Sequence, residues 1–303
     1  MLRIIVSILL LSVLSTAARA DVDLPTKFSN MGGIANTRHN LTQSTIGAGA
    51  ITMNPYRNDY AQVCVYCHTP HGASGAIDAP LWNRTLPSGP YTTYDQLNTP
   101  SLTGTVTQPG VNSLTCLSCH DGTLAIDSII NMPGAGNYLA AQETSQNDAF
   151  LNTWTNAAGA DASTHLGLDS NDPGNSCLAC HDPGAGVVGA GATDFRLFAI
   201  GTDLRDDHPI GINYPTGAKI GTEFKAITGI SASLSFFDNN GNGRADGDEI
   251  RLYSTGDGPE VECASCHDPH GVSSTGSSGG SIFPTFLRTS NSTSSVCLTC
   301  HIK

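Results

Sequence analysis

Hydrophobic residues are concentrated in one stretch near the start of the chain, and elsewhere they are scattered among polar ones. Residues 4–14 read IIVSILLLSVL and follow the short positive start MLR. The run is short for a helix that spans a bilayer, and the sequence ARA at 18–20 is a small-residue cleavage site. The pattern favours a removed signal peptide over residues 1–20 and not a membrane anchor. We expect an exported mature chain that begins near Asp21, with no membrane span after signal removal.

The rest of the chain predicts few regular elements. Long amphipathic helices are not found, and clear alternation of apolar and polar residues occurs in SASLSFF (231–237) and EIRLYS (249–254), which favours strands. The Pro/Gly segments NMPGAG (131–136) and GAG (184–186) predict turns, and HGVSSTGSSGGS (270–281) predicts a flexible surface loop. Aromatic residues are only 6% and Gly numbers 33. Such a chain needs apolar volume from something other than its side chains.

All ten cysteines fall into pairs, and every pair reads Cys-x-x-Cys-His. This spacing is that of a c-type haem attachment site, because two thiols three positions apart on one helical turn can add to the two haem vinyl groups. The following imidazole then lies under the iron as its proximal ligand. The five motifs are Cys64-Cys67-His68, Cys116-Cys119-His120, Cys177-Cys180-His181, Cys263-Cys266-His267 and Cys297-Cys300-His301.

Disulfides and zinc are the competing interpretations of these pairs. Disulfides suit an exported protein, but they give no reason for a histidine after each pair. Zinc sites would combine one Cys-x-x-Cys with a second pair or with paired histidines, and successive pairs here lie too far apart. The sequence therefore predicts five molecules of haem c.

The remaining histidines match the number of haems. They are expected to be distal iron ligands, although a lone histidine is usually an ordinary surface or core residue. Met31, Met53 and Met132 are replacement candidates, for which packing is the simpler interpretation. The five histidines are His39, His71, His165, His208 and His270.

The order of the histidines suggests how they would be paired with the haems. His71 and His270 each lie three residues after a proximal ligand, which is too close to reach the opposite face of the same haem. If each module is closed, His71 serves the haem on Cys116/Cys119 and His39 that on Cys64/Cys67. By the same reasoning, His270 serves Cys297/Cys300, His208 serves Cys263/Cys266, and His165 serves Cys177/Cys180.

The motifs divide the mature chain into three parts. We expect a dihaem module over 21–135, a single-haem segment over 136–200, and a second dihaem module over 201–303. Motif spacing is irregular, so the chain is not a fixed-period repeat. Contacts through the haems are expected to tie the parts into one unit.

A second metal site is predicted inside the last part. Residues 238–249 read DNNGNGRADGDE and match the calcium-loop pattern D-x-[DN]-x-[DN]-G-x₅-E. Gly243 would allow the sharp turn, and the flanks favour strands where an EF-hand has helices. An acidic solvated turn without an ion is the alternative. The expected ligands are the side chains of Asp238, Asn240, Asn242, Asp246 and Glu249 and the backbone carbonyl of Arg244.

With these motifs, the chain resembles a multihaem c-type cytochrome of bacterial respiratory electron transfer. CVYCHTPHG and CASCHDPHG resemble the paired-haem CxxCHxPHG segments of that group, and the segments around His39 and His208 resemble its distal-histidine segments more loosely. The resemblance implies closely stacked bis-histidine haems, low potentials and a location in the periplasm or at the cell surface. The implied fold is mostly coil, with short α-helices at the haem motifs, minor β structure and a core formed by stacked haems.

Three functions follow from this interpretation. The favoured one is a non-enzymatic electron carrier that meets other redox proteins or extracellular acceptors; its last haem, near Lys303, would lie close to the surface. The second is a multihaem reductase of a small nitrogen or sulfur oxyanion, which would need an open haem site. The third is a subunit of an extracellular haem filament, a homopolymer. The formal net charge of −12, about −14 without Arg3 and Arg19, argues against nucleic acid and anionic membranes as partners.

Overall fold

The computed structural model describes 34–42, 57–58, 60–75, 79–87, 89–102, 104–131, 166–169, 176–182, 184, 194–254, 256–271 and 284–303. The expected signal peptide, His165, the three methionines Met31, Met53 and Met132, and residues 272–281 of the predicted flexible loop lie outside these residues.

Short helices coincide with the cysteine motifs. Helix α2 (Val111–His120) carries the second motif, α4 (Leu178–His181) the third, α5 (Cys263–Cys266) the fourth and α6 (Ser295–Cys300) the fifth. Residues 64–68 of the first motif form a single turn. Four of the five motifs thus carry a short helix, and the first forms a turn. The described 3-10 turns are Ile34–Asn36, Tyr94–Leu97, Arg196–Phe198, Gly217–Lys219, Pro284–Phe286 and Ser292–Ser294.

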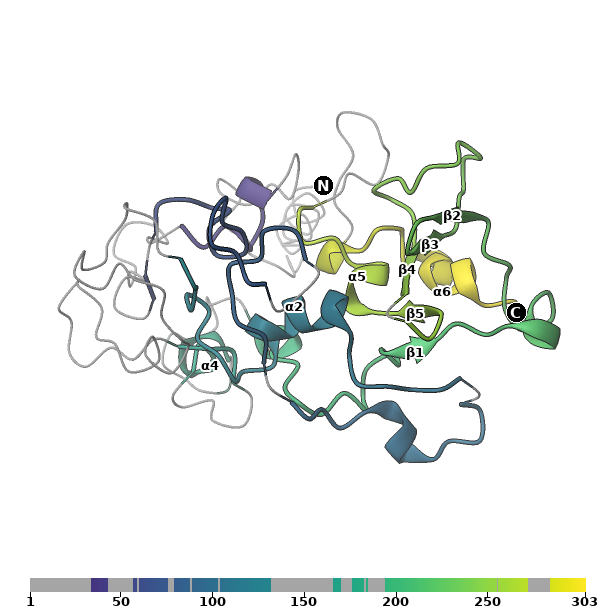
Figure 1. Ribbon diagram of the computed structural model, residues 1–303. Helices are drawn as coiled ribbons and strands as arrows, with labels where there is room; N and C mark the ends of the chain where they lie inside the picture. The colour runs from purple at the N-terminus through teal and green to yellow at the C-terminus, as the bar shows by residue number, and fades with distance from the viewer. Residues whose placement is uncertain are drawn as a thin grey trace, which may run out of the picture.

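An antiparallel sheet of five short strands lies beside the C-terminal helix (Figure 1). Its order is β1-β5-β4-β3-β2, formed by Ile212–Asn213, Pro259–Val261, Arg251–Ser254, Leu234–Phe236 and Gly229–Ser231. Strands β3 and β4, predicted by the two alternating segments, pair with Ser235 opposite Leu252. The segment between them is the predicted calcium loop, which therefore closes a β-hairpin.

The described apolar residues are buried in three small clusters, because the short helices cannot gather them around one core. One cluster centres on Tyr60 and Tyr66 near the first motif, and a second on Tyr91 and Leu117 beside α2. The largest contains Tyr214, Phe237, Ile250 and Leu252 under the sheet, with Cys266 and Cys300 packed against it. Each cluster thus lies next to at least one Cys-x-x-Cys-His turn.

Buried polar links hold separate parts of the chain together. In the centre of Figure 1, α2 lies beside α5, where Glu262 accepts hydrogen bonds from Gly110 N (3.0 Å) and from the Ser113 hydroxyl. Ser113 Oγ in turn accepts a bond from Cys263 N at 2.8 Å. The first and third parts of the chain are therefore joined by direct protein contacts. In the part of the chain that the structure describes, no helix has the length and apolarity to cross a bilayer.

Candidate metal centres

The five Cys-x-x-Cys-His segments share one backbone hydrogen bond. In each, the histidine N–H donates to the carbonyl of the first cysteine, four residues earlier. The distances outside α2 are 2.8 Å for His68, 3.0 Å for His181, 3.1 Å for His267 and 2.9 Å for His301, and His120 ends the α-helix that holds its own motif. Residues three apart on a helical turn lie on one face. Each turn therefore presents both thiols to the same side, as double attachment to one haem requires.

All ten cysteines are free thiols in the structure, and burial keeps several of them protonated. It raises the pKa of Cys67, Cys177 and Cys300 to about 12 and that of Cys266 to about 11. Zinc binds the thiolate, and reactive thiols have a lowered pKa. The surroundings of these four thiols suit uncharged sulfur, as in a thioether, better than they suit a zinc site, whereas the hydrogen bond with Cys116 lowers the pKa of Cys263.

The histidine rings are held in the orientation that a metal ligand needs. Metal-binding imidazoles usually donate their second N–H to a carbonyl or carboxylate. A carbonyl oxygen can only accept, so an Nδ1 facing it carries the proton and leaves Nε2 free for a metal. Six of the described histidines have such an acceptor for Nδ1: His39 (Pro269 O, 3.2 Å), His68 (Pro80 O, 2.8 Å), His120 (Phe198 O, 2.7 Å), His208 (Pro209 O, 3.0 Å), His267 (Thr285 O, 2.6 Å) and His270 (Asp268 Oδ1, 3.0 Å).

Burial also favours the neutral form of three of these rings, those of His39, His120 and His267. It is the main cause that lowers the pKa of His39 to about 4, with the charge of His120 second. Burial likewise lowers the pKa of His120 and of His267. Neutral imidazoles with a free Nε2 are the form that binds iron. The thiol turns and the rings therefore fit haem c.

A repeated turn supplies the Nδ1 acceptor at the first and fourth motifs. His68 forms an antiparallel bridge with Trp82, and His267 forms one with Leu287. In both cases the acceptor carbonyl lies two residues before the bridge partner, and the residue between them is left-handed (Leu81, φ 54°; Phe286, φ 61°). This turn was not predicted from the sequence. LWNRT (81–85) and FLRTS (286–290) look alike, but the similarity is too short to identify without the structure.

Two pairs of histidine rings have similar separations between their ring centroids. The ring centroids of His68 and His270 are 6.1 Å apart with an interplanar angle of 8°, and those of His39 and His120 are 6.2 Å apart at 72°. Closed modules would instead place His39 next to His68 and His270 next to His301. The structure instead places His39 beside the second motif and His270 beside the first, and the first and third parts of the chain pack against each other.

Two other expected distal ligands, His208 and His71, also lie among the described residues. His208 lies near His301, whose pKa is lowered first by burial and then by His208. The closed-module interpretation placed His208 with the fourth motif. His71 is exposed, and its carbonyl accepts hydrogen bonds from Thr69 Oγ1 (2.8 Å) and Asn131 Nδ2 (2.8 Å).

Four of the thiol turns are neighbours in a row. Asn83 N donates to Cys67 O at 2.9 Å, and the next residue, Arg84, donates to Ser118 O at 2.6 Å, which links the first turn to the second. The second is linked to the fourth because Cys263 N bonds to Ser113 Oγ, one turn before Cys116. The fourth and fifth turns share the cluster under the sheet, against which Cys266 and Cys300 both pack.

The third turn is set apart on α4, on the opposite side of Figure 1 from the sheet. Its His181 ring stacks on Phe195 with centroids 3.8 Å apart and an interplanar angle of 4°. Phe195 N also donates to His181 O at 2.8 Å. The turn is thus held by the segment that supplies Phe198 O to His120.

The predicted calcium loop folds around the carboxylate of Asp238. Asp238 Oδ1 accepts hydrogen bonds from the N–H groups of Gly241 (2.7 Å) and Asn242 (3.2 Å), and Oδ2 accepts one from Gly243 (2.8 Å). Gly243 has φ 73°, the left-handed turn for which glycine was expected. Asn240 Oδ1 accepts from Asn242 N at 3.0 Å. Asp238 Oδ2 and Asn240 Oδ1 each accept one bond and keep a lone pair that could bind a cation.

The second half of the loop is closed by its own hydrogen bonds. Asp246 Oδ2 accepts from Asn240 Nδ2 (2.8 Å) and Asn242 Nδ2 (2.6 Å), which lower the pKa of Asp246. Glu249 is 1% exposed and accepts from Asn239 N (2.7 Å) and Asp246 N (3.0 Å). Among the described residues, no three His, Cys, Asp or Glu side chains are arranged to hold a metal ion. In both halves the loop's own hydrogen bonds occupy part of the carboxylate oxygens, so Asp238, Asp246 and Glu249 would have to share them with calcium. Arg244 lies in the loop, where its N–H donates to Asn242 Oδ1 at 2.8 Å.

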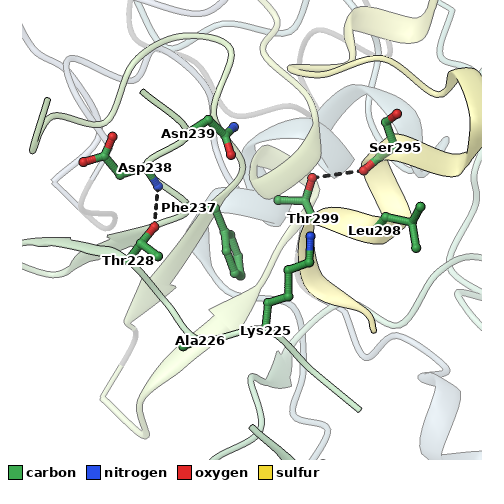
Figure 2. Close-up of a pocket in the computed structure, with 9 residues that line it drawn as sticks. All are labelled: Lys225, Ala226, Thr228, Phe237, Asp238, Asn239, Ser295, Leu298 and Thr299. Carbon is green, nitrogen blue, oxygen red and sulfur yellow. Dashed lines mark hydrogen bonds between the residues drawn. The ribbon is translucent and has the colours of Figure 1, made fainter. Parts of the chain in front are cut away.

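A pocket of about 350 Å³ lies between the start of this loop and α6. Figure 2 shows Thr228 and Asp238 on one side, joined by a bond from Asp238 N to Thr228 Oγ1 at 2.7 Å, and Ser295 and Thr299 of α6 on the other. Lys225 donates through its backbone N–H to Cys300 O at 2.8 Å. The calcium loop and the fifth thiol turn are thus close neighbours.

The chain was compared with protein-family models and with curated proteins, and it matches none of them. Its function must therefore be inferred from its own residues.

Proposed function

We propose that this chain is an exported pentahaem c-type cytochrome that carries electrons and has no substrate site of its own. The observation that carries the proposal is the shared geometry of the five Cys-x-x-Cys-His turns. Each places two thiols on one face and a histidine directly after them, and six imidazoles have Nδ1 engaged and Nε2 available. Disulfides would require neither feature, and zinc sites would not require a histidine directly after each pair of thiols.

Haem iron, when bound, supplies a one-electron couple whose potential depends on axial ligands and burial. The residues of the chain do the rest. The thiols would hold each group in position, and the histidine after each pair would be its first iron ligand. A second imidazole would complete the ligation and leave no open position for a substrate. This arrangement favours electron exchange over catalysis.

The row of neighbouring turns supports a conduit. The first, second, fourth and fifth turns are in sequential contact through Arg84, Ser113 and the cluster under the sheet. Cys64 at one end of this row and Cys297 at the other are exposed, while Cys116 and Cys263 between them are less accessible. Electrons would enter and leave at the two ends. With a net charge of −12, basic redox proteins or extracellular acceptors are the expected partners.

We also propose that the loop of residues 238–249 binds calcium as a structural ion. Support comes from the turn around Asp238 and from the oxygen-rich side chains that follow it. Because the loop adjoins α6 through the pocket in Figure 2, calcium would stabilise the fifth haem site. We expect the affinity typical of extracellular modules, a Kd of about 10⁻⁴–10⁻³ M.

Electron paramagnetic resonance (EPR) combined with a redox titration of the purified holoprotein tests the carrier function. We expect low-spin ferric signals from all five haems and no high-spin signal. A high-spin ferric haem that binds a nitrogen or sulfur oxyanion would contradict the carrier proposal and favour the reductase. Electron microscopy of secreted protein distinguishes single molecules in the periplasm or at the cell surface from a haem filament.

A further inference from the structure

The two histidine pairs differ from the closed-module prediction. His39 and His120 both belong to the first part of the chain, whereas His68 of the first part is paired with His270 of the third part. We propose that His270 is the distal ligand of the haem on Cys64/Cys67 and that His39 is the distal ligand of the haem on Cys116/Cys119. This inference rests on the proposed function. It makes the two dihaem modules dependent on each other, because the first haem takes its second ligand from the third part of the chain.

The distances fit two imidazoles on opposite sides of one iron. A histidine nitrogen lies about 2 Å from a bound metal, and the ring centroid lies a further ~1 Å behind the nitrogen, so two axial ligands have centroids about 6 Å apart. The observed separations are 6.1 Å for His68 and His270 and 6.2 Å for His39 and His120. Both pairs match this value.

Rings that stack with parallel planes in this protein lie closer than His68 and His270, whereas an edge-on pair such as Phe195 and Phe198 has centroids 6.1 Å apart at 68°. The centroids of His39 and Phe286 are 4.6 Å apart, and those of His181 and Phe195 are 3.8 Å apart, both with nearly parallel planes. The parallel pair of His68 and His270 is 1.5 Å wider than the larger of these stacks (6.1 against 4.6 Å). Direct stacking therefore does not account for the wider separation.

In the pair of His68 and His270, a hydrogen bond from Nδ1 holds each ring at the edge opposite the nitrogen that would bind iron. Nδ1 of His68 is bound to Pro80 O and that of His270 to the carboxylate of Asp268, which also accepts from Arg288 NH1 at 3.0 Å. A carboxylate behind an imidazole is a common support for a metal ligand.

The two pairs are also connected to each other. Nδ1 of His39 faces Pro269 O at 3.2 Å, and Pro269 lies between Asp268 and His270. One short segment of the third part thus supports the distal ligands of both haems. Its neighbour His267 is the proximal residue of the fourth motif, so three haem sites converge on residues 267–270.

A methionine substitution identifies which iron His270 would bind. In His270→Met, one of five haems should gain the far-red sulfur-to-iron charge-transfer band and a higher potential, because Met/His ligation raises it. Adding Cys64→Ser and Cys67→Ser removes the first haem and should abolish the band. Adding Cys297→Ser and Cys300→Ser instead is the matched control, and the band should remain. Intact mass must show four haems in both combined variants.

The opposite pattern, with the band lost only when Cys297 and Cys300 are replaced, would overturn the proposal in favour of closed modules. A band that survives both replacements would overturn it too. These outcomes differ from a failure of the proposed function, in which the wild-type chain would itself carry no haem.

A second series covers the case in which His270→Met shows no charge-transfer band or fails to fold. His39→Ala should give one high-spin haem that added imidazole returns to low spin. With Cys116→Ser and Cys119→Ser the high-spin signal should disappear, and with Cys64→Ser and Cys67→Ser it should persist. The reverse result would assign His39 to the first haem and overturn the proposal.

Discussion

Glu262 should make the stability of the protein depend on pH, and its position explains why. The carboxyl is 1% exposed and lies where α2 meets α5. Gly110 N and the Ser113 hydroxyl donate to it, and Ser265 completes a capping box with it at the start of α5. Burial is the largest influence and raises the pKa of Glu262 from 4.5 to about 7, although the two hydrogen bonds act in the opposite direction.

The sign and size of the effect follow from this pKa. A carboxyl whose pKa is higher in the folded chain contributes stability that is complete below pH 4.5 and is lost as the pH rises through about 7. At about 1.36 kcal/mol per pH unit, the loss is roughly 3 kcal/mol. Glu262→Gln imitates the protonated form. It should therefore match the wild type near pH 4.5 and exceed it by up to roughly 3 kcal/mol above pH 7.

Urea unfolding of the holoproteins at pH 4.5 and pH 8 measures this difference. With a slope near 3 kcal/mol per M, the midpoint of Glu262→Gln should lie about 1 M above that of the wild type at pH 8 and close to it at pH 4.5. Glu223→Gln is the matched control, because Glu223 is a surface carboxylate with 61% of its side chain exposed. If Glu262→Gln and the wild type lose stability in parallel from pH 4.5 to pH 8, the reasoning is refuted.

Three further predictions concern other parts of the molecule. Arg84 is fully buried and donates five hydrogen bonds. Arg84→Met should therefore lower the free energy of urea unfolding by about 4 kcal/mol, whereas Arg205→Met, at an exposed position, should lower it by under about 1 kcal/mol. Equal losses would contradict this account of Arg84. Calcium in excess should raise the melting temperature, and Glu249→Gln should weaken that response; no heat in calorimetry at millimolar calcium would exclude the site. Gly122→Ala, at φ 79°, places Cβ 2.7 Å from the Asp169 backbone, while the Cβ of Gly241→Ala, at φ 72°, meets nothing within 4 Å. Thermal unfolding should therefore show a larger loss of stability for Gly122→Ala. Equal losses of stability would argue against the close approach at Gly122.

Local patterns in the sequence predicted local structure well. Cys-x-x-Cys-His placed the short helices, and the alternation around residues 238–249 placed β3 and β4. These succeed because a helical turn and a hairpin are determined by residues close together in the chain. The left-handed turn at Gly243 belongs to the same class.

Long-range pairing was not predictable in the same way. The closed-module assignment of His39 and His270 used only order along the chain, and the packing of α2 against α5 overrides that order. Glu262 and Arg84 gave no recognisable sequence pattern, because a buried charged residue looks like a surface one until its partners are known. The carbonyl acceptors of Nδ1 come from backbone groups, which any residue can supply.

Intact mass spectrometry of the mature protein tests the central claim most directly. Five haems attached through ten thioether bonds predict a polypeptide heavier by five haem masses, with no free thiol available for alkylation. A mature chain of unmodified mass, or one whose ten cysteines all react with an alkylating reagent, would contradict the account.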